Sequence, residues 1–184
     1  MLASQRALFD IPDDVCFLNA ASYSPLPLAV LEAGRTGVGR KGRPWLIDQA
    51  FASEQYERAR GAAARLINAH PEDVALVSSV GYGVATAAKI SPVPPGSRVI
   101  VLRDDHSSPV LEWMTRADES EFAVETVQRP GDGDWTAALL SAIERPGAAP
   151  LASASNSSVH WSDGCVVDLE QYPVVGRNPA KETE

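Results

Sequence analysis

Residues 74–90 read Val-Ala-Leu-Val-Ser-Ser-Val-Gly-Tyr-Gly-Val-Ala-Thr-Ala-Ala-Lys-Ile. The first five residues form a short apolar run typical of a buried strand, and the composition from Gly83 to Ile90 favours a helix. Between them, Gly81 and Gly83 form a turn of small residues. A strand that passes through glycines into a helix is the repeating unit of α/β folds, so this stretch decides the fold class.

The same alternation continues toward the C-terminus. Short β-branched or small-residue runs alternate with helical patterns, which places strands at 98–102, 121–127 and 151–155 and helices at 109–117 and 135–143. A repeated strand–helix–strand order requires crossover connections. We therefore predict an α/β fold with a mostly parallel sheet and helices on both faces.

The first seventy residues have a different character. A short strand is predicted at 15–18, a helix opens near Pro25, and the longest helix runs from Ile47 to Asn68 with one apolar stripe formed by Ile47, Phe51, Ala59, Ala62, Ala63, Leu66 and Ile67. The last thirteen residues show no periodicity. The sequence therefore suggests three parts: an N-terminal segment at 1–70, an α/β block at 71–171 and an unpatterned tail at 172–184.

Composition narrows the classes of function. The 184-residue chain is 45% hydrophobic and carries a formal net charge of −8, which disfavours nucleic acid and anionic membranes as partners. The N-terminus lacks a long apolar segment, and no run is long enough for a membrane helix, so we expect a cytoplasmic protein. Cys16 and Cys165 lie far apart without a metal-ligand spacing, so no metal site is predicted.

The turn around Gly81 has more than one interpretation. Such a turn directs free backbone N–H groups and the positive end of a helix toward whatever lies beyond the strand, which suits a phosphate. Turns of this kind also occur in α/β proteins that bind no ligand there. A dinucleotide fingerprint is a further alternative because Asp104 and Asp105 follow the second strand, although Thr86 stands where that motif has its third glycine.

Polar and aromatic side chains follow two other predicted strands. His106 comes after the strand at 98–102, and His160 and Trp161 come after the strand at 151–155. The carboxyl ends of parallel strands meet at one edge of a sheet, where ligands of open α/β folds bind. We therefore expect these residues and the turn around Gly81 to converge on one crevice.

The order of these segments resembles a known family. Residues 17–27, 71–86, 106–113 and 159–164 are similar, in this order, to the aminotransferase class V group, which includes cysteine desulfurases, kynureninase-like enzymes and isopenicillin N epimerase-like enzymes. The resemblance covers residues 9 to about 171. It implies part of the large domain of an aspartate-aminotransferase-like fold, with pyridoxal 5'-phosphate as cofactor, an amino acid as substrate and a homodimer as the assembly.

The resemblance also implies site roles. The phosphate would bind the amides of Gly81 and Tyr82, with Gly83 opening the helix behind them. His106 would stack on the pyridine ring, and either Trp161 or His160 would approach its phenolic oxygen. The substrate pocket would be lined by Asn19, Ala20, Ala21 and Ser22.

Two groups that the family needs for chemistry are missing from the sequence. Family members carry, beyond the matched segments, an Asp that pairs with the pyridine nitrogen and a Lys that forms a Schiff base with the cofactor. The lysines of this chain are Lys41, Lys89 and Lys181, and none stands at the family's position. We therefore expect a truncated protein that keeps the phosphate site, has no catalytic residue and is inactive alone. Two alternatives stay open: a non-catalytic binding module that needs a partner chain, and a Rossmann-type dinucleotide binder.

Overall fold

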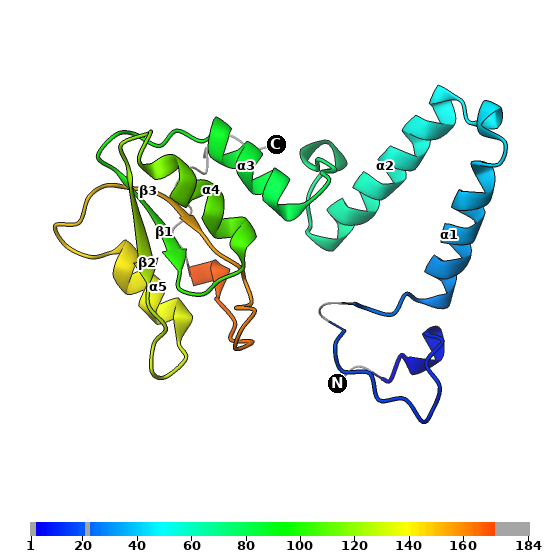
Figure 1. Cartoon of the computed structure of the whole chain (residues 1–184), viewed down its shortest axis with the longest axis horizontal. Helices are drawn as coiled ribbons and strands as arrows, with labels where there is room; N and C mark the ends of the chain where they lie inside the picture. The colour runs from blue at the N-terminus through cyan, green and yellow to red at the C-terminus, as the bar shows by residue number, and fades with distance from the viewer. Residues whose placement is uncertain (1–2, 21–22, 172–184) are drawn as a thin grey trace. The chain divides into compact units, whose positions relative to one another are not determined.

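The computed structural model describes residues 3–20 and 23–171 (Figure 1). The predicted tail at 172–184 lies outside the described residues. The chain divides into two compact units, Met1–Leu76 and Val77–Glu184, and each is described by itself.

The second unit is an α/β layer structure. Its parallel sheet has the strand order β2-β1-β3. Its elements are α3 (Val80–Ile90), β1 (Arg98–Leu102), α4 (Ser107–Ala117), β2 (Ala123–Val127), α5 (Trp135–Ile143) and β3 (Leu151–Ser155). The predicted α/β class with a parallel sheet and flanking helices is therefore confirmed.

The central strand β1 organises two apolar layers. All five of its residues are buried, and alternate side chains point to opposite faces of the sheet. One layer brings β1 together with α3 and α4 and contains Ala88, Val99, Val101, Trp113 and Phe122. The other brings β1 together with α5 and contains Ile100, Leu102, Val127, Trp135, Leu139, Ala142 and Val167. Helices therefore cover both faces of the sheet.

A buried arginine fixes the amino end of the sheet. Arg98 is only 4% exposed, and its guanidinium donates 2.8 Å to the carboxylate of Glu125 and 2.9 Å to the carbonyl of Ala142. A second donor nitrogen reaches the carbonyl of Ile143 at 3.0 Å. These bonds satisfy the charge and tie β1 to the end of α5. The opposite, carboxyl edge of the sheet carries the polar loops.

The predicted strand at 74–78 is wrong. These residues join no sheet in the described part of the chain, and Leu76 and Val77 are 47% and 49% exposed. An apolar run becomes a strand only when a neighbour accepts and donates its ladder hydrogen bonds. The short strand predicted at 15–18 is also absent, and Leu18 is 87% exposed.

The first unit is built from helices with little core. Its main elements are α1 (Leu28–Arg40) and α2 (Gln49–Leu66), and Asp48 caps α2 by accepting the Phe51 amide at 2.7 Å. The predicted long helix is present, but its apolar stripe does not form a core, since Leu66 is 88% exposed. The periodicity of a helix identifies its apolar face and not what covers that face.

Two negative findings hold for residues 3–20 and 23–171. In these ranges no helix combines the length and the apolar character needed to cross a bilayer. Nor do three His, Cys, Asp or Glu side chains come together there in a group that could hold a metal ion.

Candidate functional site

Ser79 starts α3 and sets the geometry of the glycine-containing turn. Its hydroxyl accepts the Tyr82 amide at 3.1 Å, and its carbonyl accepts the Gly83 amide at 3.1 Å. The helix therefore begins at Val80, and the prediction that it opens at Gly83 is wrong. The physical reason is the serine cap, because a hydroxyl that satisfies an N-terminal amide lets the helix begin directly after it.

Gly81, in this first turn, lies beside two serine hydroxyls. In the described part of the chain no group accepts the Gly81 amide, as is usual for the first amides of a helix. A Cβ added to Gly81 would lie 3.9 Å from the Ser108 hydroxyl oxygen and 4.0 Å from that of Ser79. The Tyr82 amide, in contrast, already donates to Ser79. Of the two amides predicted to hold a phosphate, the one at Gly81 is free.

A second helix begins at the same place. Ser108 lies in the first turn of α4, beside Gly81 in the first turn of α3. At the other end of the pair, the guanidinium of Arg116 donates to the carbonyl of Ala88. The two helices therefore run parallel, with both positive ends together. Two helix N-termini and two serine hydroxyls favour an anion such as a phosphate.

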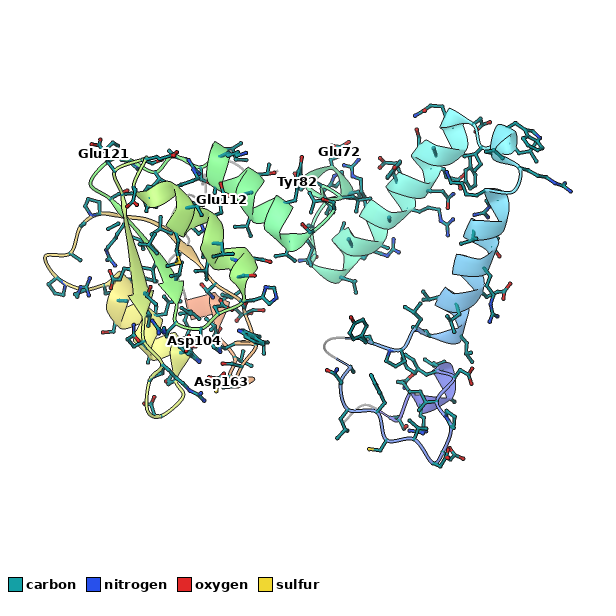
Figure 2. The ribbon with its side chains drawn as sticks, in the orientation of Figure 1. Glu72, Tyr82, Asp104, Glu112, Glu121 and Asp163 are labelled. Atoms are coloured by element: carbon teal, nitrogen blue, oxygen red, sulfur yellow. The ribbon has the colours of Figure 1, made fainter. Side chains whose placement is uncertain are left out.

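The chain turns sharply where it leaves β1. Asp104 has a φ of +56°, a left-handed conformation that aspartate tolerates better than most residues. The next residue, Asp105, accepts the His106 amide on one carboxylate oxygen at 2.7 Å. His106 then caps α4, with its Nδ1 3.4 Å from the Ser108 amide. Figure 2 labels Tyr82 at the start of α3 and Asp104 at the end of β1.

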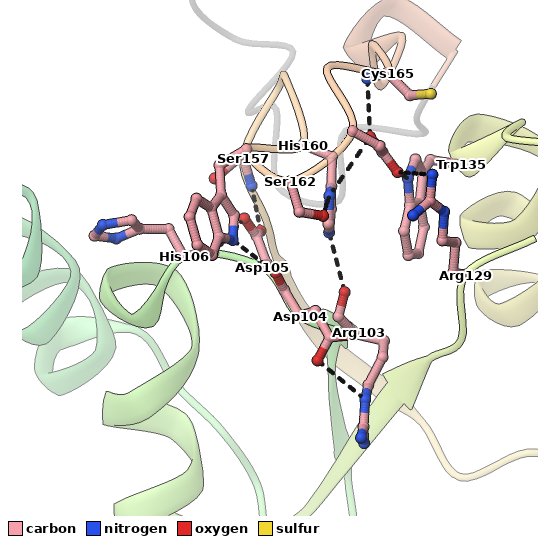
Figure 3. A network of polar contacts seen from close by, with 12 residues as sticks. Arg103, Asp104, Asp105, His106, Arg129, Trp135, Ser157, His160, Ser162 and Cys165 are labelled. Carbon is pink, nitrogen blue, oxygen red and sulfur yellow. Dashed lines mark hydrogen bonds and ion pairs between the residues drawn. The ribbon is translucent and has the colours of Figure 1, made fainter. Parts of the chain in front are cut away.

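The loop after β3 is bonded to this turn. The His160 Nε2 lies 3.0 Å from the Arg103 carbonyl, and the Trp161 indole donates to the Asp104 carbonyl at 2.7 Å. Figure 3 shows this network, with His106 on one side and Trp135 on the other. Because β1 lies between β2 and β3, its connection and that of β3 meet at the switch point of the sheet.

Two flat side chains are exposed at this switch point. The rings of His106 and Trp161 meet edge to face, with centroids 6.2 Å apart and planes at 84°. Both residues are exposed, and Trp161 retains 65% of its accessible surface. The structure thus brings together His106, Trp161 and, through Ser108, the turn at Gly81. These surfaces could contact a flat ring whose phosphate lies at the helix ends.

His160 does not share this exposure. It is completely buried, its ring stacks on Trp135 with centroids 4.6 Å apart, and its Nδ1 lies 3.0 Å from the Ser162 hydroxyl. A side chain without accessible surface cannot touch a bound ring. The sequence left Trp161 and His160 as equal candidates; His160 is buried and Trp161 is exposed, and the ligand contact itself stays a prediction.

Asp163 anchors the base of the same loop. Its carboxylate accepts the Cys165 amide at 2.9 Å and the Trp135 indole at 3.0 Å, and it lies 3.4 Å from the guanidinium of Arg129. These hydrogen bonds, led by the Cys165 amide, lower the pKa of Asp163 below its ordinary value, with smaller help from His160 and Arg129. Burial and the neighbouring Asp163 charge raise the pKa of Cys165. A raised pKa leaves less of the nucleophilic thiolate form.

The predicted substrate-pocket residues belong to another part of the chain. Asn19 and Ala20 are exposed residues of the first unit, whereas Ala21 and Ser22 lie outside the described residues. Their role stays a prediction.

Two site residues were not found by the sequence analysis. Ser79 carried a usable signal, because a serine directly before a helical pattern is a typical N-cap. Ser108 carried none, because its place beside Gly81 depends on the packing of α4 against α3.

Comparison with known proteins shows the fold. No protein-family model matches the chain, and no curated protein sequence matches it. A solved structure of a lysine-to-alanine mutant of C-DES, with glycine covalently linked to the PLP cofactor, has a TM-score of 0.70 and 17% identity over 91% of this chain and 44% of that chain.

Two further structures agree with this match. The cysteine desulfurase CsdA from Escherichia coli, in an S-sulfonic acid form, has a TM-score of 0.65 and 22% identity over 89% of this chain and 43% of that one. C-DES, a cystine C-S lyase, in complex with its product cysteine persulfide has a TM-score of 0.61 and 17% identity over 79% and 39% of the two chains. The chain thus has part of this fold, as predicted, and spans less than half the length of these proteins.

Proposed function

We propose that the chain is part of a pyridoxal 5'-phosphate-dependent protein of the aminotransferase class V group that acts on amino acids. The observation that carries this proposal is the meeting of two helix N-termini beside Gly81, next to the exposed ring of His106. The fold of the C-DES and CsdA structures supports the same assignment.

The residues present fit the phosphate end of this cofactor. The Gly81 amide is free to donate, Ser79 and Ser108 place hydroxyl oxygens beside it, and a Cβ at Gly81 would occupy that space. His106 and Trp161 would orient the ring and limit access of water to it. When bound, the cofactor supplies an electron sink for breaking bonds at the α-carbon of an amino acid.

Lys89, the lysine of α3, does not fit a covalent link to the cofactor. Lys89 lies in the last turn of α3, eight residues beyond Gly81, a rise of about 12 Å along the helix. Lys41 belongs to the first unit, and Lys181 lies outside the described residues. We therefore propose that this chain binds the cofactor without a covalent bond and does not turn over amino acids.

Two glycine substitutions on the same helix test the phosphate site. Gly81→Ala fills the space beside Ser79 and Ser108, whereas the Cβ of Gly83→Ala makes an ordinary 3.5 Å contact with Val77. Both changes favour the helix equally. Titration with pyridoxal 5'-phosphate should show affinity reduced about tenfold in Gly81→Ala, because the added Cβ keeps the phosphate from the Gly81 amide and a lost bond to a charged group costs about this much. Gly83→Ala should show little change. Equal affinities in the two variants would contradict the site.

Borohydride reduction tests the absence of a covalent link. After incubation with the cofactor and reduction, mass spectrometry should find no stoichiometric adduct on any one lysine. A single lysine that is modified to completion would overturn this part of the proposal.

The dinucleotide alternative is tested in the same titration. Gly81 and Gly83 lie within the first turn of α3 rather than in a loop before it, and both carboxylate oxygens of Asp105 already accept backbone amides. We expect NAD to leave cofactor binding unchanged. Saturable binding of NAD without binding of pyridoxal 5'-phosphate would favour the alternative.

The partner assignments complete the proposal. We propose a homodimer in the cytoplasm, with no membrane or nucleic acid as partner, supported by the net charge of −8 and by the exposed apolar side chains of the first unit. Analytical ultracentrifugation of the purified chain should show a dimer. A complex that forms only after a different chain is added would instead support the binding-module alternative.

A further inference from the structure

Asp105 bonds to both loops that form the switch point. One carboxylate oxygen accepts the His106 amide at 2.7 Å, and the other accepts the Ser157 amide at 2.8 Å. His106 caps α4, and Ser157 lies in the loop after β3 that carries Trp161. One side chain therefore connects the two segments whose rings meet at the candidate site (Figure 3).

The Asp105 carboxylate is bonded to these two backbone amides rather than to a positively charged side chain. Asp105 is half-buried, and among the described residues no Arg, Lys or His forms an ion pair with it. Its neighbour Asp104, in contrast, lies 3.3 Å from the guanidinium of Arg103 and is largely exposed. The charge of Asp105 is balanced by backbone N–H groups and by the positive end of α4.

Three other contacts hold the same two segments together without a charge. The Arg103 and Asp104 carbonyls accept the side chains of His160 and Trp161, and the Ser155 hydroxyl donates to the Pro109 carbonyl at 2.7 Å. Loss of the Asp105 bonds should therefore loosen the junction without unfolding the sheet. Asp105 therefore supplies the charged group among contacts that otherwise join side chains to backbone carbonyls.

We propose that Asp105 is a positioning residue that sets the relative placement of His106 and Trp161. It acts through the His106 and Ser157 amides and does not touch the ligand. The effect of Asp105 on cofactor binding rests on the proposed function, whereas its effect on the two loops does not. It also gives Asp105 a role other than the ribose contact considered from the sequence.

Hydrogen exchange tests the placement without any ligand. Asp105→Asn keeps the size of the side chain but removes its charge and one acceptor, while Asp118→Asn makes the same change at an exposed position at the other end of α4. The Ser157 amide should exchange about tenfold faster in Asp105→Asn and at the wild-type rate in Asp118→Asn. Asp105→Glu, which keeps the charge, should recover part of the protection. Unchanged exchange at Ser157 in Asp105→Asn overturns the proposal.

Cofactor titration then tests whether the placement serves the site. Asp105→Asn should bind pyridoxal 5'-phosphate several-fold more weakly than wild type, with a weaker circular dichroism band from the bound cofactor, and Asp118→Asn should match wild type. Faster exchange with unchanged affinity would reduce Asp105 to a structural residue and overturn the positioning role. Wild-type protein that does not bind the cofactor at all would refute the proposed function, and the exchange result would still decide the role of Asp105 in the two loops.

Discussion

The two units of the chain use their apolar residues in opposite ways. Val77–Glu184 buries two clusters around β1, whereas Ala64 is the one buried residue among the described residues of Met1–Leu76. Apolar side chains are nevertheless frequent in the first unit, and Trp45 and Leu46 are 77% and 68% exposed. The difference shows that helix signals suffice to form α1 and α2, while a core requires elements from distant parts of the chain.

A core truncation in the second unit should give the largest effect. Ile100 is fully buried in the central strand, so Ile100→Ala should cost about 2–5 kcal/mol of the free energy of unfolding. Leu46→Ala in the first unit should change it by less than about 0.5 kcal/mol. Urea unfolding followed by tryptophan fluorescence measures both variants. Equal losses would mean that the first unit also has a core.

Acid should destabilise the second unit through Asp163. The folded pKa of Asp163 lies below its ordinary value of 3.8, so its contribution to stability is full above that pH and is lost as the pH falls through the folded pKa. Asp163→Asn should flatten the decrease in thermal midpoint on acidification. The exposed Asp13, paired with Arg6 in the first unit, provides the control substitution Asp13→Asn. A steep acid dependence that persists in Asp163→Asn would assign it to another group.

Removal of a helix cap should have an effect on stability of intermediate size. Ser79 caps α3 in the second unit and Asp48 caps α2 in the first, so each change to alanine removes about 1 kcal/mol of helix stability. Because α3 packs on a core, Ser79→Ala should lower the cooperative unfolding midpoint. Asp48→Ala should mainly reduce helix content measured by far-ultraviolet circular dichroism. The same response in both variants would argue that the two helices are supported alike.

A glycine in α1 should give the smallest effect. A Cβ added to Gly34 would meet no atom within 4 Å, so Gly34→Ala should stabilise this helix by about 0.5–1 kcal/mol through helix propensity alone. Far-ultraviolet circular dichroism should show a modest gain in helix. Gly96, with a φ of +76°, is the control, because an alanine there is strained and should lower stability. A loss of helix in Gly34→Ala would reveal a close neighbour.

Local patterns identified many elements correctly. The strand at 98–102, the strand at 151–155 and the helix at 135–143 lie where the sequence placed them. Each is short and bounded by loops with clear turn residues, so nearby residues decide both its type and its ends. The same reasoning placed His106 and Trp161 at one edge of the sheet, since strand ends in a parallel sheet share an edge.

Partners far apart in the sequence decided the rest. The apolar run at 74–78 has strand composition but no ladder partner among the described residues, and the stripe on α2 has no covering layer there. His160 and Trp161 are adjacent in sequence, yet packing on Trp135 buries the first and leaves the second exposed.

The amino-acid sequence by itself determined the α/β class and the order of the strands and helices from residue 98 to residue 155, because these depend on hydrophobic period. Only the tertiary structure decided that Ser108 lies beside Gly81 and that Asp105 joins the two loops. These contacts depend on distances between residues that are remote along the chain, and local propensity carries no information about them.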